Sequence, residues 1–216
     1  KSIKGKFYFR DFHSSENNNF FIDFLIRKKE VIPKLIFIGY INLEENENSI
    51  WSYLRSSYKN LIKKYQSKLK VIILEKKNIK LKENLFIKCR DEYKKNILKK
   101  NTRSNKNWLS FKKLIQGGKA MILTCFDDKN KLIGYISITS FANYSYYASA
   151  LNIDKSLPVN HLLLWESIKK SKKDGKKKLE LGICKTDRVV NNKLTNIFMF
   201  KKGFCSNFRP VIDYEF

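Results

Sequence analysis

Three β-rich runs in the middle of the chain limit most strongly what it can fold into. They occupy residues 120–126, 131–140 and 144–153, and each is rich in β-branched or aromatic side chains. The first two runs are joined by the turn-forming tetrapeptide DDKN. This spacing predicts an antiparallel meander.

The segments before the meander alternate between strand and helix patterns. Residues 34–43 follow Pro33 and read as a strand. Residues 49–68 place apolar side chains three or four positions apart, which predicts one helix whose opposite face carries Arg55 and several lysines.

A second strand and two helices complete the part that precedes the meander. Residues 69–74 form a short apolar run that predicts a strand. We expect helices at about 82–99 and 106–116, the latter ended by the Gly117–Gly118 pair.

The stretch HLLLWESIKKSKKDGKKKLELG, residues 161–182, raises the question of a basic arm for nucleic acid. Its apolar residues recur at helical spacing, Asn160 is a candidate N-cap, and Gly175 is a natural stop. Residues 179–183 then read as a strand. The lysines therefore fall in the last turn of a helix, where cations complement the helix dipole, and we expect a solvated surface there. A helix at 192–202 and a strand at 208–216 follow.

Composition restricts the class of protein and its surroundings. A hydrophobic content of 43% allows a real core, while a formal net charge of +25 attracts phosphates, nucleic acid or an anionic surface. The same charge also fits the lysine-rich composition of an AT-rich genome.

The four cysteines are widely spaced, which fits neither a zinc site nor a small disulfide scaffold; we expect no metal and a cytoplasmic location. No apolar run is long enough for a transmembrane helix, and we expect no signal peptide; since the sequence begins with Lys1, we also expect that upstream residues are missing.

The order of these elements from residue 69 onward resembles the acyltransferase fold of the GNAT superfamily. The local sequence resembles the FemAB-like, or BioF2-like, branch of that superfamily. The similar pieces cover about residues 50–205: WSYLRSSYKNLI (51–62), TRSNKNW (102–108), SYYAS (145–149), HLLLWESI (161–168), LELG (179–182) and NIFMFKKGF (196–204).

The resemblance implies an α/β (α+β) fold in which helices flank a mixed, twisted sheet that contains the meander. Members of the FemAB-like branch typically contain two GNAT-like halves. We therefore expect residues 1–50 to be the end of a first half and residues 51–216 to be a GNAT-like domain. The family transfers an acyl or aminoacyl group to an amine of a cell-envelope or surface-sugar precursor, which implies a bacterial enzyme in the cytoplasm or at the inner membrane surface.

One loop departs from the acetyl-CoA enzymes of this superfamily. Those enzymes have a glycine-rich loop before the helix that follows the meander, and the helix N-terminus binds the pyrophosphate. Here the loop is NIDKSLPVN, residues 152–160, which contains no glycine. The donor, acetyl-CoA or aminoacyl-tRNA, therefore stays open, and the expected partner is an anionic substrate such as CoA, tRNA or a phosphorylated sugar or precursor.

Four residues are candidates for the chemistry. The resemblance implies that Lys201, in the FKxGF motif, stabilises negative charge at the reaction centre. His161 can accept a proton near neutral pH, and Glu180, in a strand expected to be central, is either a general base or one half of an ion pair. Tyr147 ends the meander beside the expected groove. Each of these residues also has a purely structural interpretation.

Five further residues are candidates for substrate binding. Arg103, beside Ser104 between two helices, can hold a carboxylate or a phosphate in a fork, or can form a structural ion pair. Arg55 resembles an arginine on a family helix that faces a phosphorylated substrate. Lys202 neighbours Lys201. Tyr146 neighbours Tyr147, and strand alternation directs these two to opposite faces, so at most one of them lines the site.

The sequence therefore predicts an acyltransferase that works by direct attack, since no activated serine or cysteine is evident. Two alternatives remain open, a basic nucleic-acid-binding module and a GNAT-like scaffold without catalysis. The chain lacks the common nucleic-acid-binding motifs, but fold alone does not guarantee activity.

Overall fold

The computed structural model describes residues 8–11, 27, 32–97, 103–186 and 192–215. The chain divides into two compact units, one of Ile41–Glu180 and one of Lys1–Tyr40 together with Leu181–Phe216. Among the described residues, no helix has the length and apolar character that crossing a bilayer requires.

The sheet of the Ile41–Glu180 unit is built around the meander. Its strands β3 (Lys70–Leu74), β4 (Ala120–Phe126), β5 (Leu132–Phe141) and β6 (Tyr144–Asn152) lie side by side in chain order, and each neighbouring pair is antiparallel. The first residues of β7 (Lys178–Thr186) pair with β6 in parallel, which makes the sheet mixed. Both the predicted meander and the mixed sheet are confirmed.

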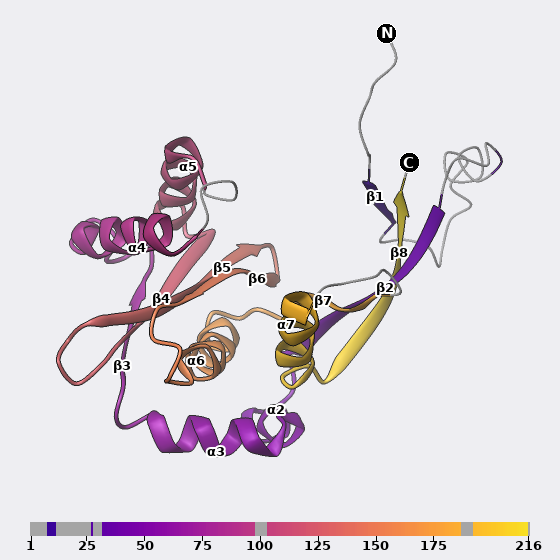
Figure 1. Ribbon diagram of the computed structural model, residues 1–216, viewed down its shortest axis with the longest axis horizontal. Coiled ribbons are helices and arrows are strands. Elements are labelled where there is room, and N and C mark those ends of the chain that lie inside the picture. The colour runs from indigo at the N-terminus through magenta and orange to yellow at the C-terminus, as the bar shows by residue number, and fades with distance from the viewer. Residues whose placement is uncertain (1–7, 12–26, 28–31, 98–102, 187–191, 216) are drawn as a thin grey trace, which may run out of the picture. The chain divides into compact units, whose positions relative to one another are not determined.

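Helices cover both faces of this sheet (Figure 1). Helices α4 (Glu83–Asn96) and α5 (Asn105–Gln116) lie on one face. Helix α6 (Val159–Lys173) packs on the other face, and α2 (Glu47–Tyr53) and α3 (Ser56–Tyr65) lie against α6. Because both faces are covered, every residue of β4 is buried.

Gly134 brings α6 close to the strands. A Cβ at this position would lie 2.7 Å from the carbonyl oxygen of Leu151 on β6 and 2.9 Å from Cγ1 of Val159, the first residue of α6. Any larger side chain would push the helix away from β5. Glycine thereby fixes the distance between the sheet and the start of α6.

The segment expected to be one helix at residues 49–68 forms two. Helix α2 ends at Tyr53 with Leu54 as its C-cap, and Arg55 is the N-cap of α3; ψ is 141° at Leu54 and 135° at Arg55, so neither residue is helical. The apolar spacing continues across the break, because Ile50, Leu54 and Tyr58 are all buried. A regular pattern of burial therefore concealed the change of direction.

Helix α6 differs from its prediction at its N-terminal end, whereas its C-terminal end is as predicted. The N-cap is Pro158, without a side-chain cap bond, and Asn160 lies inside the helix, so the predicted cap is wrong. At the C-terminal end Gly175 has a φ of 72°, as a helix stop requires. Two of its lysines make specific contacts: Lys172 donates to the carbonyl oxygens of Leu43 and Glu45, while Lys170 pairs with two carboxylates.

The other unit contains β1 (Tyr8–Asp11), β2 (Ile32–Asn42), α7 (Asn192–Lys202) and β8 (Asn207–Glu215). Strand β8 pairs antiparallel with both β1 and β2. Gly39 provides room for two buried thiols, since a Cβ there would lie 2.4 Å from Sγ of Cys184 and 2.3 Å from Sγ of Cys205.

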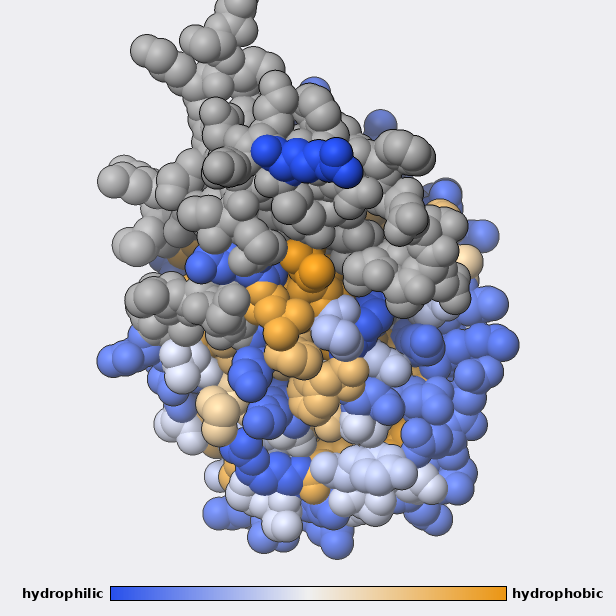
Figure 2. Space-filling model, turned by 90° about the vertical axis from the view of Figure 1, so that its right-hand side faces the viewer, coloured by the Kyte–Doolittle hydropathy of each residue, from blue (hydrophilic) through white to orange (hydrophobic). Residues whose placement is uncertain are grey.

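Figure 2 shows hydrophobic residues gathered among hydrophilic ones on the face in view. Among the described residues of this unit, the large apolar side chains that are exposed are Leu35, Leu194, Ile197, Met199 and Phe208.

Candidate active site

Strand β6 has an open edge within the Ile41–Glu180 unit. Its parallel pairing with β7 runs only from Tyr144, opposite Lys178, to Tyr146, opposite Glu180. Beyond that point the described residues pair β6 with β5 alone, and a bulge leaves Ala148 without a partner in the register. A bulge redirects the backbone locally, and an open edge presents N–H and C=O groups to a ligand. The edge from Tyr147 onward can therefore hold an extended ligand.

Tyr146 and Tyr147 occupy opposite faces of β6, as predicted. Tyr146 stands opposite Thr139 and is 44% exposed, whereas Tyr147 stands opposite the buried Ile138. Burial raises the pKa of the Tyr147 hydroxyl well above its ordinary value. Tyr147 therefore remains a proton donor at neutral pH and cannot serve as a base.

His161 lies in the first turn of α6 and packs against α3. Its ring and that of Tyr58 meet edge to face, with centroids 4.4 Å apart. Arg55 completes the group, since its Cζ lies 5.1 Å from the centroid of the Tyr58 ring and its Nη1 donates to the Tyr58 hydroxyl at 3.4 Å. The structure thus brings together two predicted site residues, Arg55 and His161, through a third residue, Tyr58.

The electrostatics of this group keep His161 neutral. Burial is the largest effect, and together with the positive charge of Arg55 it lowers the pKa of His161 to about 4, although a hydrogen bond with the Pro158 backbone opposes the change. The pKa of Tyr58 is raised by burial, against the opposing charge of Arg55. At neutral pH the group therefore consists of an uncharged imidazole, a protonated phenol and a guanidinium.

Arg103 and Ser104 lie near the other face of the sheet. Arg103 precedes α5, and its guanidinium lies over the rings of Tyr93 and Trp108. Ser104 is the N-cap of α5, where its hydroxyl accepts a hydrogen bond from the Asn107 N–H at 3.2 Å. The structure therefore separates these two residues from Arg55 and His161, and it gives Ser104 a structural function.

Of the remaining predicted residues, Glu180 is the last residue of the Ile41–Glu180 unit. Lys201 and Lys202 belong to the other unit. Glu180 is half-buried on β7, opposite Tyr146. Lys201 and Lys202 lie in the last turn of α7, half-buried and exposed respectively. Lys201 is close enough to Cys205 that its charge lowers the pKa of that thiol, although the neighbouring Cys184 and burial raise it more strongly.

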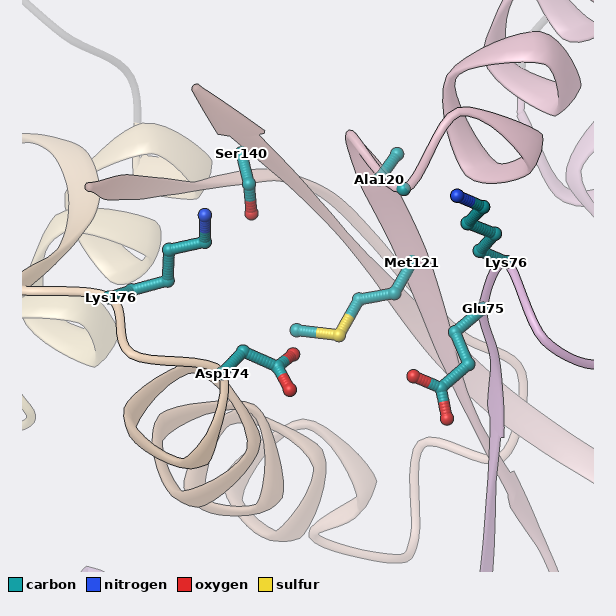
Figure 3. Close-up of a pocket in the computed structure, with 8 residues that line it drawn as sticks. Glu75, Lys76, Ala120, Met121, Ser140, Asp174 and Lys176 are labelled. Carbon is teal, nitrogen blue, oxygen red and sulfur yellow. The ribbon is translucent and has the colours of Figure 1, made fainter. Parts of the chain in front are cut away.

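A cavity of about 220 Å³ opens at the C-terminal end of α6, away from His161. Figure 3 shows side chains of both charges around it, with Asp174 and Lys176 on one side and Glu75 and Lys76 on the other. Lys170 bridges the two carboxylates, at 2.9 Å from Glu75 and 2.6 Å from Asp174. Burial alone would raise the pKa of Glu75, but hydrogen bonds from Lys77 and Lys170 outweigh it and lower the pKa. Paired in this way, the Glu75 carboxylate stays charged at neutral pH.

Sequence reasoning did not select Tyr58 or the bulge at Ala148. Tyr58 was recognised only as part of an apolar helix face, and it is indeed buried. The bulge has no sequence signal of its own, because alanine fits any position of a strand. Within the described part of the chain, no cluster of metal-ligating side chains is present.

Solved structures with the same arrangement of elements decide the fold. The structure of FemX superposes with a TM-score of 0.60 at 11% sequence identity, over 82% of this chain and 61% of FemX. The structure of L-PGS from Bacillus licheniformis superposes with a TM-score of 0.58 at 10% identity, over 90% of this chain and 64% of that one. A tandem GNAT protein from the clavulanic acid biosynthesis pathway gives a TM-score of 0.52 at 9% identity, over 98% and 63%.

The fold is GNAT-like and FemAB-like. This GNAT-like chain spans less than two thirds of the length of each of these three proteins. No protein-family model matches its sequence, and no curated protein sequence matches it either. The likeness is therefore one of fold, carried by topology at sequence identities of 9–11%.

Proposed function

We propose that this protein is an acyl- or aminoacyltransferase that acts on an amine of a cell-envelope or surface-sugar precursor. The observation that carries the proposal is the open, bulged edge of β6 beyond Tyr146. An acyl donor extended along this edge would pair with its backbone groups as an added strand does. Backbone N–H groups at the bulge would then lie beside the donor carbonyl, where negative charge develops during acyl transfer.

The proposed reaction is a direct attack by the neutral amine on the donor carbonyl. A C–N bond forms, the bond to the leaving sulfur or oxygen breaks, and the proton lost by the amine ends on the leaving group. The ammonium of the tetrahedral intermediate is much more acidic than a free ammonium. A weak base therefore suffices to accept its proton, and His161, which is neutral with a pKa of about 4, meets this need. The protonated Tyr147 would supply a hydrogen bond or a proton to the leaving group.

The other predicted residues keep proposed roles. Lys201 would stabilise negative charge at the reaction centre, and Glu180 would accept a proton as a general base. Lys202 and Tyr146 would contact the substrate. Arg55, whose backbone starts α3 and whose guanidinium is fixed against Tyr58, would attract a phosphorylated group. Arg103 would bind an anionic group on the opposite face of the sheet.

The loop before α6 favours a donor other than acetyl-CoA. Asp154 holds this loop by accepting hydrogen bonds from the backbone N–H and hydroxyl of Ser156, at 2.9 and 2.6 Å. These bonds lower the pKa of Asp154 and keep it charged. A fixed carboxylate in the loop would repel a pyrophosphate. Aminoacyl-tRNA is consistent with this loop and with the net charge of +25. Another protein of similar fold, a putative lysylphosphatidylglycerol synthetase from Agrobacterium fabrum, is named for an aminoacylated product.

The test compares donors at physiological salt. Acetyl-CoA, aminoacylated tRNA and uncharged tRNA are each titrated into the protein, and transfer to an amine acceptor is followed with labelled donor. We expect aminoacylated tRNA to bind more tightly than uncharged tRNA and to support transfer. We also expect His161→Gln to reduce the transfer rate by about 10²–10⁴-fold, as loss of general base catalysis does, while the control Lys113→Gln on the exposed side of α5 has no effect.

Each other outcome points to a different class of protein. Tight binding and turnover of acetyl-CoA would identify an N-acetyltransferase. Equal binding of charged and uncharged tRNA with a steep salt dependence and no transfer would identify a nucleic-acid-binding module. No binding of any donor would indicate a scaffold and contradict the proposed function.

A further inference from the structure

Two buried polar groups on the α4/α5 face of the sheet have no hydrogen-bond partner. They are Nε1 of Trp108, on α5, and the hydroxyl of Tyr135, on β5; the residues are 2% and 1% exposed. Both belong to the same core cluster. Nearly all buried polar atoms in folded proteins find a partner, because an unmet donor costs its full desolvation. Two unmet donors in one cluster therefore point to a missing acceptor.

Two other hydroxyl groups on this sheet face have hydrogen-bond partners. Ser137, two residues beyond Tyr135 on the same strand face, lies 2.6 Å from the hydroxyl of Ser149 on β6. Thr124, opposite Tyr135 on β4, donates to the carbonyl oxygen of Ile72 at 2.8 Å. The unmet donors are thus a local feature of the Trp108–Tyr135 region and not a property of the whole face.

Arg103 supplies a positive charge beside these donors. Its Cζ lies 5.7 Å from the ring centroid of Tyr93, 5.9 Å from that of Trp108 and 6.0 Å from that of Phe111. Its charge reaches the Tyr135 hydroxyl, whose pKa it lowers against the stronger effect of burial. Among the described residues no carboxylate pairs with Arg103. The side chain of Arg103 is half-buried, so its guanidinium reaches solvent, whereas Nε1 of Trp108 and the Tyr135 hydroxyl are buried.

We propose that Arg103, Trp108 Nε1 and the Tyr135 hydroxyl form a binding site for a carboxylate group. The guanidinium would hold the carboxylate by charge and by its paired N–H groups, and the indole and the phenol would each donate one hydrogen bond. The inference goes beyond the proposed transfer reaction, since carboxylate binding here requires no chemistry at the β6 edge.

The charge balance favours a carboxylate over a phosphate. Arg103 lies against a cluster of buried apolar and aromatic side chains that includes Leu74, Ile79, Phe86, Cys89, Phe111 and Ile115. A single negative charge matches a single guanidinium. A phosphate dianion would bring a second, uncompensated charge into apolar surroundings, which is costly.

The indole N–H of Trp108 provides a direct reporter of the site. The chain contains three tryptophans, so its ¹H–¹⁵N spectrum has three indole signals, and Trp108→Phe assigns the one of interest. Sodium acetate is titrated into the full chain, with sodium chloride and inorganic phosphate at matched ionic strength as parallel series. We expect acetate to shift the Trp108 signal in a saturable manner, and chloride and phosphate to leave it in place.

Matched variants separate a binding site from a structural cluster. Arg103→Gln should abolish the acetate-dependent shift, whereas Lys106→Gln, which removes an exposed charge from the first turn of α5, should preserve it. Tyr135→Phe should weaken acetate binding about 10- to 150-fold, the usual range for one hydrogen bond to a charged group. In the absence of acetate it should raise the melting midpoint by about 2–4 °C, since an unmet hydroxyl is removed.

Three results would overturn the proposal. The first is a Trp108 signal that acetate does not move. The second is a shift that persists unchanged in Arg103→Gln. The third is a lower melting midpoint for Tyr135→Phe together with a water cross-peak at the indole N–H, because a bound water would then satisfy both donors. Equal shifts with phosphate and acetate would reject the carboxylate preference.

Discussion

At the scale of the residue, the protonation state of His161 follows from what packs around it. The sequence offers a histidine near a helix start with an ordinary pKa close to 6.5. The edge-to-face contact with Tyr58 and the nearby guanidinium of Arg55 remove water and add positive charge. The imidazole is therefore uncharged even well below neutral pH. An uncharged imidazole can act as a weak base, but it cannot bind a phosphate as a cation.

The depressed pKa of His161 predicts a pH dependence of stability. Its folded value of about 4 lies below the ordinary 6.5, so the unfolded chain binds the extra proton first. The contribution of His161 is fully present above the ordinary pKa and is lost as pH falls through the folded pKa. Urea unfolding of the wild type and of His161→Phe between pH 7 and pH 5 measures this effect. We expect the free energy of unfolding to fall more steeply in the wild type, and equal slopes would contradict the prediction.

Arg55 should influence the same titration. Because its charge lowers the pKa of His161, we expect Arg55→Gln to raise that pKa toward 6.5. An NMR titration of the imidazole signals reports the change, with Lys63→Gln, an exposed charge on the same helix, as the control. A larger change in the control than in Arg55→Gln would show that the effect is not local.

At the scale of the element, the position of α6 depends on close contact with the strands. Gly134 leaves no space for a side chain between β5 and the first turn of α6, where Val159 lies. The same turn carries His161, so the spacing at Gly134 also sets where the imidazole lies. A change in this one contact would therefore affect both stability and the candidate site.

We expect Gly134→Ala to destabilise the protein by about 1–3 kcal/mol, the usual cost of overpacking a core. A Cβ 2.7 Å from a backbone oxygen cannot be accommodated by a rotamer change. Chemical denaturation measures the loss, and Gly117→Ala is the matched control, because its nearest contact is 3.4 Å. Equal stability of the two variants would show that α6 is free to shift.

The cap of α5 separates two interpretations of Ser104. Its hydroxyl satisfies the Asn107 N–H, so Ser104→Ala should cost about 1 kcal/mol and Ser104→Asp, also a good cap, should preserve stability. If Ser104 acts only as a cap, donor and acceptor binding should follow the same order in these variants. Full stability in Ser104→Asp with lost substrate binding would instead support the predicted contact with substrate.

At the scale of the whole molecule, the net charge of +25 is spread over exposed lysines. Few of these exposed lysines have an acidic partner among the described residues. The half-buried Lys170, in contrast, forms ion pairs with both Glu75 and Asp174. Such an excess of like charge destabilises the compact state by repulsion, which salt screens. The charge therefore acts on stability whether or not it also serves a ligand.

We expect the melting midpoint to rise when sodium chloride increases from about 20 to about 200 mM, a range over which the screening length falls to less than half. Differential scanning calorimetry measures the midpoint, and a zwitterion such as glycine at the same concentrations serves as the unscreened control. A midpoint that falls with sodium chloride would mean that the ion pairs contribute more than the repulsion.

The sequence alone determined the local elements and their order. Alternation and helical spacing located the meander, α5, α6 and β3 closely, because each pattern reflects a period of a few residues. The order of the elements, together with the local sequence resemblance, predicted the GNAT-like fold, which the structural comparisons confirm. The break at Leu54–Arg55 was missed, since the burial pattern continues across it.

Only the tertiary structure decided which predicted residues meet. It joined Arg55 to His161 through Tyr58, placed Arg103 near the opposite face of the sheet, and left β6 with an open edge beyond Tyr146. None of these facts has a local pattern, because contacts between distant segments depend on how whole elements pack. The same holds for the pKa of His161 and for the unmet donors of Trp108 and Tyr135, since burial is a property of the folded chain and not of the residue.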